Sequence, residues 1–357
     1  MFIYVPTFGG VVSLKDYPKK LLWWTKNAIF KYKAVLISYG MLELSAVTYN
    51  WREEAFVDDD VLVIGDSGGF QMASKGKYIN PIDVINWQLK NVDIAFPLDL
   101  PAKTAITGKP MTIDEFVECA KITAKNIDII YDIVKSSRIR FYLILHGNTN
   151  KKKEAWWKIA VEPYLDIADG IAVGTDPPSS YKQVMIDLGY MYEKGIENVH
   201  ILGVGGFKTM IPMVYYSDKF KLLTTDSSTP LSMIGRATIM IPGDHRKIRI
   251  GRVGLKKNIN FNNLLCNCPA CTEAKKDGYT NIFDLSHKEK IFYVRIHNLF
   301  WYITFIDKMH WLKESNKLFD YAKEKGVDLT FLDDVEDLGF ERAYRKHFER
   351  KGLGRWL

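Results

Sequence analysis

Short apolar runs rich in β-branched residues recur along the chain, and each is followed by a polar or glycine cluster and then by a helical pattern. Continuous apolar strands of this kind suit a parallel sheet that is covered on both faces. The runs predicted to be strands are AVLISYG from Ala34, VLVIGDSG from Val61, DIAFPLDL from Asp93, FYLILHGN from Phe141, GIAVGT from Gly170, VHILGVGG from Val199, KLLTTDSS from Lys221 and RKIRIGRV from Arg246. Eight such units predict an α/β fold of the (β/α)8 TIM-barrel type, with an open doubly wound sheet as the alternative.

Two of the intervening segments carry clear helix signals. PIDVINWQLKN begins with Pro81, a residue suited to the first helical position. MTIDEFVECAKITAKNIDIIYDIVKSS is a long amphipathic pattern with Thr112 as its candidate cap. The pattern changes after the last predicted strand, from LLCNCPACTEAKK onward. We expect one barrel domain over residues 1–357, with a zinc-binding subdomain over 256–310 inserted within it.

Composition narrows the class of protein without identifying it. Hydrophobic residues make up 47% and charged residues 25% of the 357 positions, which are globular values. The net charge of +7 is compatible with a polyanionic partner and equally with an ordinary basic protein. The first residues show no secretory signal pattern, so the expected location is the cytoplasm, or the host cytoplasm if the protein is phage-encoded.

Three of the four cysteines form a C-x-C-x2-C cluster at Cys266, Cys268 and Cys271. Together with His297, which lies in a helical apolar pattern, they would complete a tetrahedral zinc site with no open position, which is typical of a structural metal. His287 competes with His297 for the fourth place on spacing alone.

In a parallel barrel the chemistry lies where the strands end. The residues read at those positions are Asp66, Asp99, His146 with Gly147, Gly170, the run from Gly203 to Gly206, and Asp226. The segment GDSGG from Gly65 also matches the surroundings of a serine-protease nucleophile, which would be Ser67. However, the histidines lack a recognisable protease context, so Ser67 is expected to position the turn.

These segments resemble the guanine transglycosylases, a family that replaces guanine in a polynucleotide by a 7-deazaguanine and is best known from tRNA. The resemblance covers about residues 60 to 300 and follows the family's order. Its motifs are DSGGFQ from Asp66, LD at Leu98 and Asp99, HG at His146, GIAVG at Gly170, LGVGG at Leu202, TDSS at Thr225, and the cysteine cluster with His297.

The resemblance implies a zinc-bearing barrel that exchanges bases through a covalent intermediate. Asp226 would be the nucleophile and Asp66 the general acid/base. A third carboxylate, Asp99, would accept hydrogen bonds from the donor edge of guanine. The base pocket would be completed by His146, Gly147, Gly170 and Phe70.

The sequence departs from the family's usual pattern around the base. His146 replaces glutamine, Asp169 replaces glycine, Phe70 replaces tyrosine and Leu202 replaces methionine, which leaves the incoming base open, with 7-cyano-7-deazaguanine as an example. After Asp226 the sequence SSTPLSMIGRA also differs from bacterial tRNA enzymes.

This altered segment, and the absence of the carboxyl-terminal RNA-binding domains of archaeal members, resemble the DNA-modifying branch, so DNA is narrowly favoured over tRNA. The expected partners are a nucleic acid, a 7-deazaguanine base and a second copy of the chain. Phosphates would contact basic residues at Lys256, Lys257, Arg342, Arg345, Lys346 and Arg350. A noncatalytic nucleic-acid-binding subunit and a hydrolase that only removes the base are the alternative functions.

Overall fold

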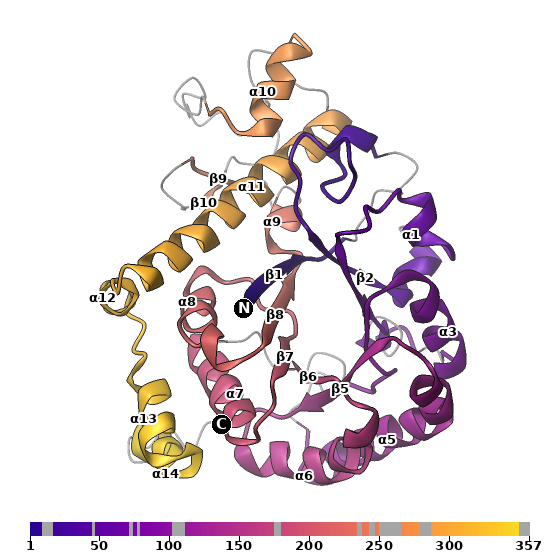
Figure 1. Cartoon of the computed structure of the whole chain (residues 1–357), viewed down its shortest axis with the longest axis vertical. Helices are drawn as coiled ribbons and strands as arrows, with labels where there is room; N and C mark the ends of the chain where they lie inside the picture. The colour runs from indigo at the N-terminus through magenta and orange to yellow at the C-terminus, as the bar shows by residue number, and fades with distance from the viewer. Residues whose placement is uncertain are drawn as a thin grey trace.

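The protein folds as a closed barrel of parallel strands, seen down the barrel in Figure 1. The computed structural model describes residues 1–8, 17–44, 47–70, 74–76, 79–101, 111–174, 180–233, 238–242, 247–249, 266–278 and 287–349. The eight-stranded sheet has the order β1-β8-β7-β6-β5-β4-β3-β2. Its strands are β1 (Phe2–Pro6), β2 (Ala34–Ser38), β3 (Leu62–Asp66), β4 (Ile94–Ala95), β5 (Arg140–His146), β6 (Gly170–Gly174), β7 (Asn198–Ile201) and β8 (Leu222–Ser227).

The first and second strands close the ring. Thr7 forms a parallel bridge with Leu36, and the backbone N–H of Phe8 donates to the carbonyl of Leu36 at 2.8 Å. Closure removes the exposed edges that an open sheet would have. The barrel prediction is therefore confirmed, and the doubly wound alternative is wrong.

Helices surround the barrel on the outside (Figure 1). They are α1 (Trp51–Glu54), α3 (Pro81–Asn91), α5 (Ile113–Ser136), α6 (Asn150–Ala160), α7 (Tyr181–Glu193) and α8 (Phe207–Tyr215). Short 3-10 turns lie at η2 (Lys19–Leu21), η3 (Tyr39–Leu44), η4 (Glu162–Ile167) and η5 (Ser217–Lys219). Helix α3 has Pro81 at its first turn as predicted, and α5 begins with a capping box between Thr112 and Glu115.

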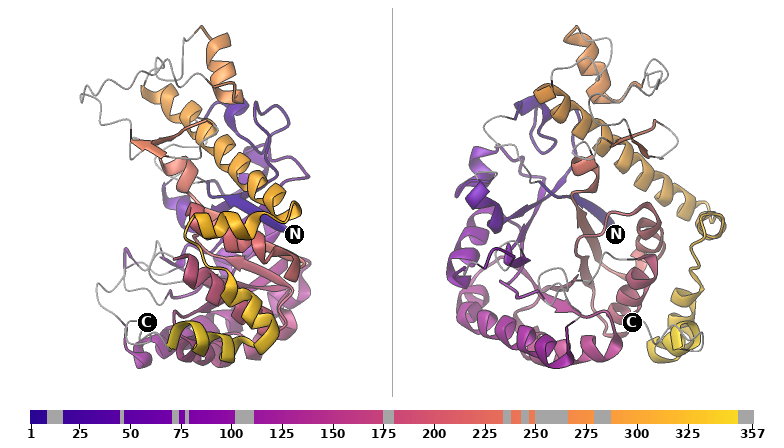
Figure 2. Two further views of the ribbon diagram at one scale, coloured as in Figure 1. Left: turned by 90° about the vertical axis from the view of Figure 1, so that its left-hand side faces the viewer. Right: turned by 180° about the vertical axis from the view of Figure 1, so that it is seen from behind.

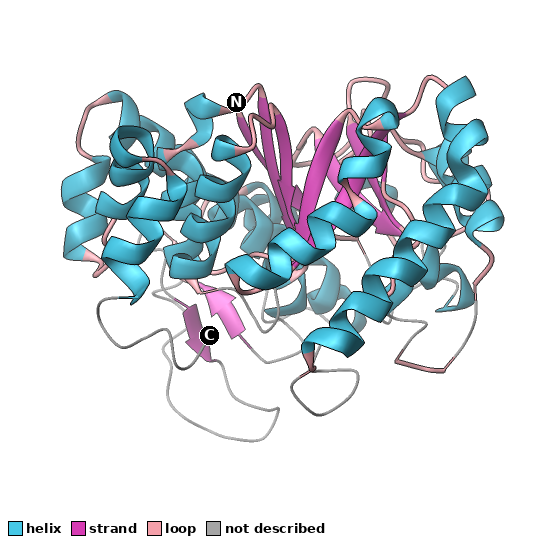
Figure 3. Ribbon diagram, turned by 90° about the horizontal axis from the view of Figure 1, so that it is seen from below, coloured by secondary structure: helices cyan, strands magenta, loops and turns pink. Residues whose placement is uncertain are grey.

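One predicted strand is wrong and one true strand was missed. The run from Arg246 is not part of the barrel: β10 (Lys247–Arg249) pairs antiparallel with β9 (Thr238–Met240) in a separate two-stranded sheet (Figure 3). Its alternating charged and apolar residues are typical of a strand with one solvated face, not of a barrel strand. The missing barrel strand is β1, which pairs with β8.

The remaining helices follow the last barrel strand, β8, along the chain. They are α9 (Thr229–Ser232), α10 (Pro269–Lys276), α11 (His287–Glu314), α12 (Leu318–Glu324), α13 (Thr330–Leu338), α14 (Phe340–Tyr344) and the π-helical turn η8 (Arg345–Glu349). Helix α11 packs against α8, α9, α10 and β9, while α13 and α14 pack on α7 (Figure 2). Among the described residues, no helix has the length and apolarity that a membrane crossing requires.

The strand periodicity separates two cores. Side chains at alternate positions fill the barrel interior, including Val5, Leu36, Ile64, Tyr142 and Ala172. The intervening positions pack outward against the helices. The inward register continues to the last residue of several strands, so polar residues at those positions face the mouth of the barrel.

Candidate active site and metal centre

Asp226 is held by three donors at the end of β8. Its Oδ2 accepts from the Thr7 hydroxyl at 2.8 Å, and its Oδ1 accepts from the Gly203 N–H at 2.7 Å. The Nε2 of His200 lies 3.3 Å from the same Oδ1. Burial raises the pKa of Asp226, but the hydrogen bonds and charge of these neighbours outweigh it, so the pKa is below its ordinary value. Asp226 is therefore ionised and oriented, as a nucleophilic carboxylate must be.

Asp66, at the end of β3, has the opposite electrostatic character. Burial, followed by the charges of Asp99 and Asp226, raises its pKa to about 6, although hydrogen bonds from Ser38 and the Gly68 N–H act against the shift. The Ser38 hydroxyl donates to Oδ2 of Asp66 at 2.7 Å. A carboxyl group with this pKa can hold and release a proton near neutral pH, which suits a general acid/base.

Asp99 and His146 form a buried pair. The Nε2 of His146 lies 2.8 Å from Oδ2 of Asp99, and the Ser67 hydroxyl is 3.3 Å from Oδ1. The imidazole also packs edge-on against Trp156, with ring centroids 4.7 Å apart. This arrangement fixes Asp99 as an acceptor at the barrel mouth and leaves Ser67 in a supporting position, as predicted for the GDSGG turn.

Close backbone packing explains two glycines at the site. A Cβ at Gly69 would lie 2.3 Å from the carbonyl oxygen of Asp99, and one at Gly174 would lie 2.4 Å from Cε1 of His146. Neither contact is tolerated by a real side chain. Gly147 directly follows His146 and lies against the start of α6, where a Cβ would be 2.7 Å from the Lys153 N.

The predicted place of Gly170 is wrong. Gly170 begins β6 and pairs with Tyr142, whereas the strand ends at Gly174, opposite His146. The two glycines are separated by most of the length of the strand, so only Gly174 reaches the mouth. The departure noted at Asp169 lies at the same far end: its carboxylate accepts from the Phe141 N–H at 2.8 Å and supports the start of β5.

Other predicted residues lie at or outside the rim. Phe70 follows the Asp66 turn, and 39% of its surface is exposed. Arg342, Arg345 and Lys346 are exposed on α14 and η8, and Lys346 pairs with Asp334 at 2.7 Å. Lys256, Lys257 and Arg350 lie outside the described residues.

The site residues that were not identified from the sequence include Thr7, Ser38, Gly174 and His200. Thr7 directly follows β1, the strand that was missed, and Gly174 lies at the opposite end of a strand whose first glycine was chosen instead. His200 lies between valine and isoleucine in β7 and reads as a core position. The inward alternation of β7 and β8 is the signal that could have indicated it, since His200 pairs with Thr224 and Asp226 lies two residues further on the same face.

The three cysteines and His297 form a cluster that could hold a metal ion. The Nδ1 atom of His297 lies 3.4 Å from the Sγ of each of Cys266, Cys268 and Cys271, and all four side chains are buried. These separations approach the tetrahedral edge of about 3.5 Å expected from Zn–S and Zn–N bond lengths. The side chain of His287, the alternative ligand, lies outside the described residues.

The ligand geometry of His297 is fixed from its far side. Its Nε2 lies 2.9 Å from the Met240 carbonyl, to which it donates, so the lone pair of Nδ1 faces the sulfur atoms. Cys268 also caps helix α10 by accepting from the Cys271 N–H. The cluster can therefore hold a tetrahedral ion such as zinc, and it ties together β9, α10 and α11.

The comparison with known proteins agrees with this geometry. The chain is 26% identical over 299 residues to the tRNA-guanine(15) transglycosylase of Saccharolobus solfataricus. This relative is a guanine transglycosylase, the family that the sequence motifs resemble. The aligned part covers 75% of this chain and 51% of that relative, so the chain spans about half the length of the transglycosylase that it matches. No protein-family model matches the chain.

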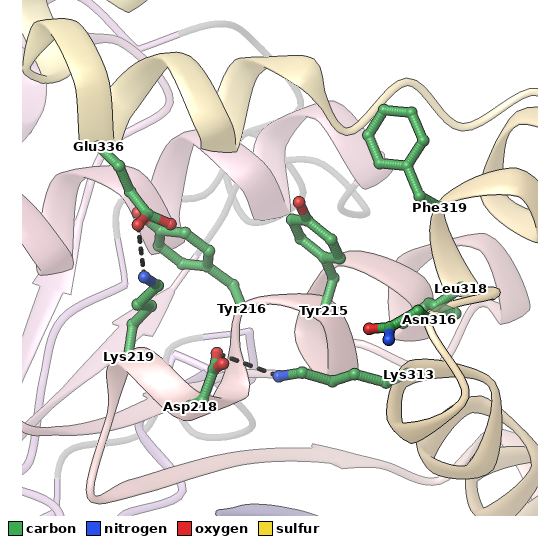
Figure 4. Close-up of a pocket in the computed structure, with 9 residues that line it drawn as sticks. All are labelled: Tyr215, Tyr216, Asp218, Lys219, Lys313, Asn316, Leu318, Phe319 and Glu336. Atoms are coloured by element: carbon green, nitrogen blue, oxygen red, sulfur yellow. Dashed lines mark hydrogen bonds and ion pairs between the residues drawn. The ribbon is translucent and has the colours of Figure 1, made fainter.

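A pocket lies away from the residues that resemble the transglycosylase site. Figure 4 shows this cavity of about 340 Å³, between the segment before β8 and the C-terminal helices. It is lined by Tyr215, Tyr216, Asp218, Lys219, Lys313, Asn316, Leu318, Phe319 and Glu336. Its cations are paired within it, Lys313 with Asp218 at 3.0 Å and Lys219 with Glu336. Because it lies where the strands begin, it does not belong to the candidate active site.

Proposed function

We propose that this protein is a pentosyltransferase that exchanges guanine in a polynucleotide for a 7-deazaguanine. The observation that carries the proposal is the placing of Asp66 and Asp226 at the same end of the barrel with pKa values shifted in opposite directions. Pairs of carboxyl groups whose surroundings separate their pKa values are suited to divided acid and nucleophile roles. The relationship to a tRNA-guanine transglycosylase supports the same reaction.

In the first half-reaction, a carboxylate oxygen of Asp226 forms a bond to the anomeric carbon of the sugar. The bond between that carbon and the guanine nitrogen breaks, and its electron pair leaves with the base. The protonated carboxyl of Asp66 supplies the proton that the departing guanine needs. The product is a glycosyl ester on Asp226.

The second half-reaction reverses these steps with the new base. The ring N–H of the incoming 7-deazaguanine gives its proton to the Asp66 carboxylate, and the nitrogen attacks the anomeric carbon. The ester bond breaks and Asp226 becomes a carboxylate again. Its lowered pKa makes it a good leaving group for this step.

Base recognition is assigned to Asp99, His146 and the flanking backbone. Asp99 would accept hydrogen bonds from the ring N–H and the amino group of guanine. The contact between Nε2 of His146 and Oδ2 of Asp99 would fix the orientation of the carboxylate. Phe70, a partly exposed aromatic residue, would stack on the base once the nucleotide has flipped out of the base stack. The incoming base that we propose is 7-cyano-7-deazaguanine.

The polynucleotide is the finer part of the proposal. DNA is the first candidate, because SSTPLSMIGRA after Asp226 departs from the pattern of bacterial tRNA enzymes. The second candidate is tRNA, because the relative from Saccharolobus solfataricus is named for that substrate. For the cysteine cluster we propose a zinc ion with a structural role, since four protein ligands leave no position for substrate or water.

The experiment supplies labelled guanine and 7-cyano-7-deazaguanine to the purified protein with duplex DNA, single-stranded DNA and tRNA in parallel. We expect incorporation into DNA and a covalent protein–polynucleotide adduct that Asp226→Ala abolishes. Incorporation into tRNA alone would replace the first candidate by the second. Abasic sites without incorporation would indicate a hydrolase, and binding without either product would indicate a noncatalytic subunit.

A further inference from the structure

His200 is a buried histidine inside the barrel whose two nitrogens are both engaged. It is 0% exposed and faces inward from β7. Its Nδ1 lies 2.7 Å from the Thr224 hydroxyl, and its Nε2 lies 3.3 Å from Oδ1 of Asp226. The imidazole also packs against the ring of Phe96, with the two ring centroids 5.1 Å apart, and Phe96 belongs to the apolar barrel interior. With one edge packed and both nitrogens occupied, the imidazole has one available orientation.

The strand register produces this arrangement. His200 is the Cα partner of Thr224 across β7 and β8, and Thr224 and Asp226 lie on the same face of β8. The Thr224 hydroxyl lies 3.4 Å from the Val199 carbonyl oxygen, and this contact limits the rotation of the hydroxyl. The chain Thr224–His200–Asp226 is therefore set by the barrel backbone, independently of the loops around the mouth.

The two oxygens of Asp226 have different surroundings. Oδ1 receives the Gly203 N–H at 2.7 Å and the imidazole at 3.3 Å, both from rigid groups. Oδ2 receives only the Thr7 hydroxyl among the described residues, at 2.8 Å. In a glycosyl ester one oxygen is bonded to the sugar and the other becomes the acyl oxygen. Fixed N–H donors can stabilise the acyl oxygen of the ester. The Thr7 hydroxyl, in contrast, can rotate away from Oδ2 when that oxygen bonds to the sugar.

We propose that His200 is a positioning residue for the nucleophile: with Gly203 it fixes Oδ1 as the acyl oxygen and presents Oδ2 to the anomeric carbon. The inference rests on the proposed function, because it assigns a role within that reaction. It does not involve base recognition, since the contacts of His200 are with Thr224 and Asp226, and those of Asp99 are with His146 and Ser67.

The test uses two side chains of nearly equal length at position 200. His200→Gln keeps an N–H donor within reach of Asp226, whereas His200→Met fills similar space without one. For His200→Met we expect the rate of covalent adduct formation in a single turnover to fall about 10- to 100-fold, with the KM for guanine unchanged. His200→Gln should recover most of that rate. His310→Gln, at a histidine on α11 outside the site, is the matched control and should leave the rate unchanged.

Equal adduct rates in wild type and His200→Met would overturn the inference, as would equal losses in the Met and Gln variants. If His200→Met does not fold, Thr224→Val and Thr224→Ser provide the same comparison one step further back. Val removes the hydroxyl that orients the imidazole and should slow adduct formation, Ser should restore it, and equal rates would contradict the proposal. No adduct with the wild-type protein would overturn the proposed function itself.

Discussion

At the scale of the residue, two carboxyl groups that share one end of the barrel have pKa values shifted in opposite directions. Asp66 has few donors relative to its burial, so its pKa rises to about 6. Asp226 is less exposed than Asp66, but its carboxylate has Thr7, His200 and Gly203 as hydrogen-bond partners, and its pKa falls. Between these two pKa values the first group is protonated and the second is ionised, which is the state that the first half-reaction requires.

The first prediction is a pH dependence of guanine release. The rate of adduct formation should be high below pH 6 and fall as the pH rises through about 6, because Asp66 then loses the proton that the leaving base needs. Base incorporation should change in the opposite direction, because it needs the ionised form of Asp66. Single-turnover rates measured from pH 5 to 8 with each half-reaction isolated would check this, and parallel profiles for the two halves would contradict it.

The second prediction concerns stability. A carboxyl group whose pKa is raised from 3.8 to about 6 on folding stabilises the folded state fully below pH 3.8, and this stabilisation is lost as the pH rises through about 6. Asp66→Asn does not titrate, so it should be more stable than wild type at pH 7.5 by about 2 kcal/mol, and the difference should shrink near pH 4.5. Urea unfolding at both pH values measures this. The exposed Asp59→Asn is the control, and a pH-independent difference for Asp66→Asn would show that its pKa is not raised.

The third prediction separates the two ends of β6. Gly174→Ala would place a Cβ 2.4 Å from the His146 ring and displace it from Asp99, so guanine binding should weaken about 10-fold or more. Gly170→Ala also meets close atoms, including the Asn198 carbonyl at 2.6 Å, but at the other end of the barrel. It should lower the melting temperature without changing the KM for guanine. Equal KM values in the two variants would remove Gly174 from the base pocket.

At the scale of the element, patterns that depend on neighbours in sequence were predictable and those that depend on partners in space were not. The capping box at Thr112 and the C-x-C-x2-C cluster each depend on residues that are close together in sequence, and both are present. Strand β1 was missed because no helix precedes it to mark its start. The contact between His200 and Asp226 requires the register of β7 against β8, which the sequence does not contain.

The fourth prediction concerns the metal centre as a support for two helices. Cys271→Ser should reduce bound zinc to a small fraction and lower stability by about 3 kcal/mol or more, because an ion held by the cluster would join α10 to α11 and, through His297, to β9. Cys119→Ser, at a buried cysteine of α5, should keep the zinc. Elemental analysis and thermal unfolding measure both effects. Full zinc occupancy in Cys271→Ser would show that the cluster is not the ligand set.

At the scale of the whole molecule, the candidate nucleophile lies on the seam between β1 and β8, where the first strand of the chain joins the last strand of the barrel. Strand β1 pairs with β8, and Val5 is the register partner of Asp226. The Tyr4 hydroxyl donates to the Ser227 carbonyl at 2.7 Å across this seam, while Thr7 donates to Asp226. The contacts between the β1 segment and β8 therefore both stabilise the closed barrel and orient the Asp226 carboxylate.

The fifth prediction distinguishes these two roles. Tyr4→Phe removes a buried hydrogen bond and should lower the free energy of unfolding by about 1 kcal/mol with little change in adduct formation. Thr7→Val, which keeps the shape of the side chain, should slow adduct formation about 10-fold with a smaller effect on stability. Denaturant unfolding and single-turnover assays on both variants give the comparison. A reversed order of effects would show that Thr7 is a structural residue only.

The seam also has a consequence for biosynthesis. During translation, the segment that carries Phe2–Pro6 leaves the ribosome more than 200 residues before the strand with which it pairs. Until β8 has been made and has paired with β1, the ring cannot close, and the Thr7 hydroxyl has no carboxylate to which it can donate. The nascent chain would therefore lack an oriented Asp226 until this strand pair forms. The proposed chemistry would depend on the last strand of the barrel to be synthesised.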